Sequence, residues 1–105
     1  MQNFDEFLSE GETLRSISQY VVSRPEEDTG PDGQTQVVTA QMEIRVLKIL
    51  NGERKGQFQA IPYLGLVYGA EEFLSRGDTE EQVLCETLRR MKGVPFDQIF
   101  PTDAP

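Results

Sequence analysis

The sequence predicts an α+β fold in which a C-terminal helix packs on one face of a three-stranded antiparallel sheet. Two observations carry this prediction. Residues 38–46 alternate between apolar and polar side chains, which is typical of a strand with one face on a core and one in water. Residues 79–92 repeat apolar side chains at helical spacing and have suitable start and stop residues at their ends.

The length of the chain sets the number of domains. A chain of 105 residues with 37% hydrophobic residues is long enough to bury one modest core. We therefore expect residues 1–105 to form a single domain.

The N-terminal third predicts a short helix followed by a strand. Phe4, Phe7 and Leu8 have helical spacing, and Gly11 can end that helix. Residues 13–24 are rich in β-branched and aromatic side chains and form the first predicted strand. Residues 25–33 contain two prolines, two glycines and four acids, so we expect a mobile acidic loop there.

The middle of the chain predicts a β-hairpin. The second strand spans 35–50, and its alternation changes parity at Val46–Leu47, which indicates a β-bulge or a strand end covered on both sides. Asn51–Gly52 favours the positive φ angles of a tight turn, and the third strand spans 57–67. Because Pro62 has no N–H to donate, this strand is expected to lie at a sheet edge or to break there.

The C-terminal third is predicted to be helical. Asp78 or Thr79 can cap a helix over 79–92, whose apolar stripe consists of Leu84, Leu88 and Met91 and is widened by Val83. Residues 95–100 form a single further turn, and residues 101–105 are expected to be a loose tail.

The residue types required for catalysis are scarce. The chain has no histidine, one cysteine, and no phosphate-binding, nucleophile-elbow or metal-ligand motif. Adjacent acids occur at 26–28, 71–72 and 80–81, where solubility and helix-dipole roles explain them. We therefore predict a protein that is not an enzyme and that uses no cofactor and no metal.

The charge of the chain limits its partners. A formal net charge of −8 disfavours nucleic acids and anionic membranes, because both bind through Lys and Arg. Another protein, especially a basic one, is the expected partner. The single cysteine and the absence of a signal-peptide pattern in the first residues predict a cytoplasmic protein.

The leading functional prediction is a protein-binding accessory or regulatory factor that acts through a sheet edge and exposed aromatic residues. Tyr63, Leu64 and Tyr68 lie on or beside the predicted edge strand, where a partner strand can add. Phe96, Ile99 and Phe100 form a second candidate docking point, with packing on the protein's own core as the alternative.

Other functions remain as alternatives. The acidic charge is also compatible with an inhibitor or immunity-type protein that blocks a basic enzyme. A small-molecule carrier, with its ligand held between sheet and helix, is a third hypothesis, although no residue indicates which ligand would bind. Edge strands also pair between identical chains, so a homodimer is a further alternative.

Overall fold

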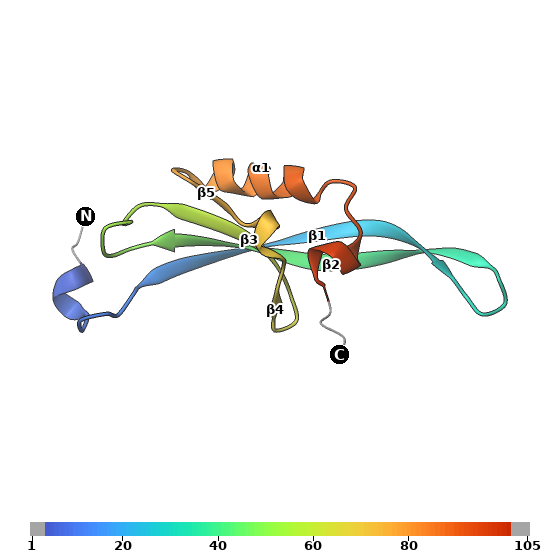
Figure 1. Cartoon of the computed structure of the whole chain (residues 1–105), viewed down its shortest axis with the longest axis horizontal. Helices are drawn as coiled ribbons and strands as arrows, with labels where there is room; N and C mark the ends of the chain where they lie inside the picture. Colours follow the sequence, from blue (N-terminus) through green and yellow to red (C-terminus); the bar gives the residue numbers. More distant parts are fainter. Residues whose placement is uncertain (1–3, 102–105) are drawn as a thin grey trace.

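The computed structural model describes residues 4–101 and shows an α+β fold with an antiparallel sheet and a C-terminal helix (Figure 1). The sheet has five strands rather than the three that the sequence predicts. Its order is β1-β2-β3-β4, and β5 also pairs with β3. The elements are η1 (Phe4–Phe7), β1 (Arg15–Thr29), β2 (Thr35–Ile49), β3 (Phe58–Leu64), β4 (Val67–Tyr68), η2 (Glu71–Phe73), β5 (Ser75–Gly77), α1 (Glu80–Met91) and α2 (Phe96–Ile99).

The β1–β2 hairpin is longer than predicted. The first strand does not end at Arg24, and β1 runs through most of the expected 25–33 loop to Thr29. Its register with β2 continues from Arg15↔Ile49 to Thr29↔Thr35, so the bulge considered at Val46–Leu47 is absent. Residues 25–39 are largely exposed and project beyond α1 and α2, as Figure 1 shows. We call residues 25–39 the arm.

Pro25 fits within β1 because its backbone nitrogen faces away from β2. The N–H of Leu50 donates to the carbonyl of Leu14. Since bonding alternates along an antiparallel strand, even-numbered residues of β1 bond to β2 and odd-numbered ones point away. The N–H that Pro25 lacks would therefore face outward, where no bond to β2 is lost.

The third predicted strand is not a free edge, which corrects that expectation. β3 pairs with β2 on one side, and on the other it pairs with β5 at Phe58–Ala60 and with β4 at Tyr63–Leu64. Pro62 lies where the neighbouring strand changes, and its carbonyl accepts a 2.8 Å hydrogen bond from the N–H of Gly69. The strand predicted over 57–67 thus divides into β3 and β4. Within the described chain β1 is the edge strand on one side of the sheet, and the short strands β4 and β5 lie at the other.

The core lies between α1 and the even-numbered face of the sheet. Its buried apolar residues are Met42, Ile44, Val46, Ala60, Phe73, Val83, Met91, Ile99 and Phe100. Val83 and Met91 are buried, as predicted, but Leu88 is exposed and Thr87, outside the predicted stripe, is buried. The buried face of α1 is thus shifted by about one residue from the predicted stripe. Thr87 is buried where the pattern predicts Leu88.

Local capping bonds define the start of α1. Thr79 is the N-cap, and its hydroxyl accepts a 3.1 Å hydrogen bond from the N–H of Gln82. The side chain of Gln82 accepts in return from the N–H of Asp78. Thr79, rather than Asp78, is therefore the cap, and the Gln82 side chain adds a bond to the residue before it.

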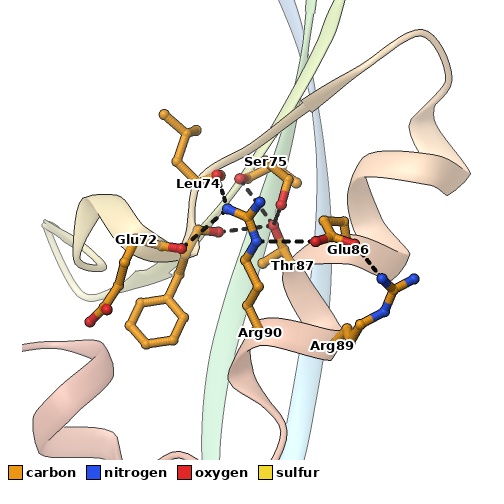
Figure 2. Close-up of polar contacts among 9 residues, drawn as sticks. Glu72, Leu74, Ser75, Glu86, Thr87, Arg89 and Arg90 are labelled. Carbon is orange, nitrogen blue, oxygen red and sulfur yellow. Dashed lines mark hydrogen bonds and ion pairs between the residues drawn. The ribbon is translucent and has the colours of Figure 1, made fainter.

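Polar contacts fasten α1 to the η2–β5 segment (Figure 2). The Thr87 hydroxyl oxygen lies 2.9 Å from Ser75 Oγ, 3.0 Å from the carbonyl oxygen of Phe73 and 3.2 Å from that of Ala60. Arg90, one turn further along, donates to the carbonyl oxygens of Glu72 and Leu74. The short strand β5 is therefore held by side chains of the helix as well as by its ladder with β3.

Candidate protein-binding surface

The sheet face opposite α1 presents the odd-numbered residues of β1, β2 and β3. Three cross-strand rows make up this surface, which we call the open face: Ile17, Leu47 and Gln59; Gln19, Arg45 and Ile61; Val21, Glu43 and Tyr63. Ile17 is 54% exposed and Val21 is 63% exposed, although both belong to strands. Apolar side chains of the edge strand therefore remain exposed to water on this face.

A stack of aromatic and cationic side chains lies at one end of the open face. The guanidinium carbon of Arg45 lies 3.6 Å from the centre of the Tyr63 ring, within the range of a cation–π interaction. Tyr63 in turn meets the ring of Tyr68 edge-on, with the centroids 5.0 Å apart. The stack joins β2, β3 and β4 and fixes the orientation of three large side chains.

The hydrogen-bonding capacity of Arg45 is unused. Its Nε is buried without a hydrogen-bond partner, and no described residue forms an ion pair with the guanidinium. A buried donor without a partner costs about 1–3 kcal/mol. The outer nitrogens of the group are therefore suited to an acceptor supplied by another molecule.

The turn between β3 and β4 carries exposed apolar side chains. Gly65 has φ 51°, which lets the chain reverse tightly between Leu64 and Val67. Leu66 at the turn is 94% exposed, and Leu64, Val67 and Tyr68 are also exposed. We call residues 64–68 the apolar tip; in Figure 1 it points away from the side of the β1–β2 hairpin on which α1 lies.

A groove connects the apolar tip to the open face. Its volume is about 430 Å³, and its lining includes Val21, Glu43, Tyr63, Leu64 and Leu66. The groove lies beside the Arg45–Tyr63–Tyr68 stack, so apolar, aromatic and charged groups are within reach of one ligand surface.

The sequence-predicted partner residues fall into two groups. Tyr63, Leu64 and Tyr68 come together at the apolar tip. Ile99 and Phe100 are instead buried in the core, and Phe96 stacks against Phe100 with centroids 6.2 Å apart. The 95–100 segment therefore packs on the protein's own core, which is the alternative that the sequence left open.

Sequence reasoning missed Arg45 and Leu66. The alternation over 38–46 places Arg45 among the polar residues of a strand, and its stacking on Tyr63 depends on the cross-strand register. Leu66 falls within the predicted strand over 57–67, although Gly65 between two leucines is a signal for a turn.

The pKa of a tyrosine on the helix-covered face is raised. Partial burial, followed by a hydrogen bond to the Glu80 carboxylate and its negative charge, raises the pKa of Tyr20 above its ordinary value of 10.0. Tyr20 lies on the helix-covered face, so this titration is separate from the open face. Within residues 4–101, no cluster of three or more Cys, Asp or Glu side chains could hold a metal ion.

No helix in the described part of the chain is both long and apolar enough to cross a bilayer. Neither a protein-family model, nor a curated protein, nor a solved structure matches this chain.

Proposed function

We propose that this protein is a non-catalytic accessory or regulatory factor that binds another protein through the apolar tip and the adjoining open face. The observation that carries the proposal is Leu66, almost fully exposed at a tight turn beside the Arg45–Tyr63–Tyr68 stack. Folding the monomer gains nothing from an exposed leucine, whereas burial against a partner contributes about 1.5–3 kcal/mol. That contribution corresponds to about a tenfold or greater gain in affinity.

The residue types around Leu66 support the same conclusion. Tyrosine and arginine are enriched among the residues that dominate binding energy, because large rings and guanidinium groups lose little freedom when they are buried. Tyr63 and Arg45 are already held by their stacking contact. A partner that brings an apolar pocket and one hydrogen-bond acceptor would match this surface.

The test compares capture of proteins from the native host by the wild-type chain and two variants. Leu66→Asp places a charge at the apolar tip, and Leu88→Asp places the same charge on an exposed position of α1 outside the surface. Both side chains are exposed, so circular dichroism should show two folded variants.

We expect one or more proteins to be captured by the wild type and by Leu88→Asp, and to be lost with Leu66→Asp. Equal capture by all three chains would refute the surface, and capture of nothing by the wild type would refute the function.

The acidic arm supports a second candidate function. Glu26, Glu27, Asp28 and Asp32 lie along a two-stranded extension that reaches beyond the body of the protein. A projecting acidic ribbon can enter a basic cleft, as an inhibitor of a basic enzyme would. In that case the captured partner should be basic, and its affinity should fall steeply between low and moderate salt. Salt-independent binding would count against this candidate.

A further inference from the structure

The outer edge of β1 is the longest unpaired backbone in the described chain. β1 occupies the end of the sheet order, and its hydrogen-bonding direction exposes the N–H and C=O groups of every odd-numbered residue. Before Pro25 removes one donor, five successive outward-facing residues carry both groups: Arg15, Ile17, Gln19, Val21 and Ser23. Exposed edges are usually shortened, bulged or protected by lysine or proline. β1 is long and without a bulge, and Pro25, near its far end, is its one proline.

Apolar side chains flank this edge on both sides of the sheet. Ile17 and Val21 are exposed on the open face. On the helix-covered face, a groove of about 400 Å³ lies between β1 and α1 and is lined by residues that include Val22, Cys85 and Leu88. A strand added to β1 would therefore gain both ladder hydrogen bonds and apolar contacts above and below the sheet.

The charges along β1 indicate which strand fits. Arg15 lies at the start of β1, and Glu26, Glu27 and Asp28 lie near its end. An antiparallel copy of the same strand brings the basic start of each chain beside the acidic end of the other. A parallel copy would place like charges together.

We propose that β1 pairs antiparallel with β1 of a second copy, so that the protein forms a homodimer with one continuous sheet. The register that sets Arg15 opposite Glu27 places Val21 opposite Val21 of the second copy. It also places Gln19 opposite Ser23, and Pro25 opposite Ile17 costs one hydrogen bond at each end.

The two-fold axis in this arrangement is perpendicular to the sheet, so both α1 helices lie on one side and both open faces on the other. The dimer presents two apolar tips. The proposal does not depend on the proposed function, because the dimer edge and the apolar tip are different surfaces.

The test measures the mass of the full chain by sedimentation equilibrium over a range of concentrations. We expect a species of twice 11.9 kDa for the wild type. Arg15→Glu and Glu27→Arg should each weaken the dimer about tenfold, because the altered contact occurs twice in a symmetric interface. The double variant Arg15→Glu/Glu27→Arg should restore dimer affinity to within about threefold of the wild type.

A backbone probe tests the edge itself. Gln19→Pro removes an N–H that faces away from β2, at a position equivalent in direction to Pro25, so it should leave the fold intact and abolish the dimer. Leu66→Asp should leave the mass unchanged, which separates this proposal from the proposed function.

Two results would overturn the inference. One is a single-chain mass for the wild type up to about 100 μM. The other is a dimer whose affinity is unaffected by the single charge reversals, because its interface would then lie elsewhere. The charge reversals involve exposed side chains, so this comparison remains decisive even if Gln19→Pro fails to fold.

Discussion

Replacing Thr87 with valine tests the polar contacts that fasten α1 to the sheet. Thr87 is fully buried, and its hydroxyl contacts Ser75 and the carbonyl oxygens of Phe73 and Ala60. One hydroxyl has one proton, so Thr87 donates to one acceptor at a time and can accept from Ser75. Valine has nearly the same shape but removes both bonds and leaves buried polar groups without partners.

The expected loss follows from these two bonds. Each contributes about 1 kcal/mol net, and each buried group left unsatisfied costs about 1–3 kcal/mol. We expect Thr87→Val to lower the free energy of unfolding by about 2–4 kcal/mol. For a domain of this size the midpoint of thermal unfolding should fall by about 4 °C per kcal/mol.

Urea unfolding followed by circular dichroism measures this loss, with Thr87→Ser as the matched control. Serine keeps the hydroxyl and loses one buried methyl group, so it should cost only about 1 kcal/mol. Thr87→Val, which conserves the side-chain volume, should therefore be less stable than Thr87→Ser. A Thr87→Ser variant as unstable as Thr87→Val would show that packing, rather than hydrogen bonding, determines the role of this residue.

Three further predictions concern α1 and the face that it covers. Thr79→Ala should lower the free energy of unfolding by about 1 kcal/mol in urea titrations because it removes the N-cap acceptor, whereas Thr79→Ser should cost little. Arg90→Met should cost about 1–2 kcal/mol through the loss of bonds to two backbone carbonyls, and Arg89→Met, which removes only a surface ion pair, should cost less than about 0.5 kcal/mol. Because the pKa of Tyr20 is raised in the folded state by burial and by Glu80, its contribution to stability is present below pH 10 and is lost as the pH rises through that raised pKa. Tyr20→Phe should therefore reduce the alkaline loss of unfolding free energy, and an identical pH dependence in the two proteins would contradict this assignment.

The parts of the fold that follow from local pattern were predictable from the sequence. The alternation over 38–46 identified the central strand, and Thr79 and Gly93 marked the ends of α1. Both patterns involve residues close together in the sequence, so each segment alone is enough to predict its own secondary structure. The helix face was less predictable, because Thr87 is buried through polar partners on other elements and its hydrophobicity gives no sign of burial.

The errors arose where distant segments decide the structure. Residues 25–29 have a loop-like composition, yet pairing with β2 keeps them extended. β3 is not the edge that the sequence predicts, because two very short strands, β4 and β5, pair with its outer side. Ser75–Gly77 is a strand of only three residues and carries no periodic pattern that predicts one.

The candidate site was predictable only in part. Tyr63 and Tyr68 stood out as aromatic residues near a suspected edge, and they do meet at the apolar tip. The contribution of Arg45 requires the register between β2 and β3, which spacing along one strand does not reveal.

The length of the arm implies that resistance to unfolding varies along the β1–β2 hairpin. Around Ile44 the two strands are backed by α1 and the core. Residues 35–39, by contrast, are exposed and are held only by backbone pairing with β1. Local opening near the Gly30–Gln34 turn therefore needs to break only a few hydrogen bonds, whereas exchange of the Ile44 amide requires opening of the core. Deuterium should replace amide protons first at the end of the arm and last beneath α1.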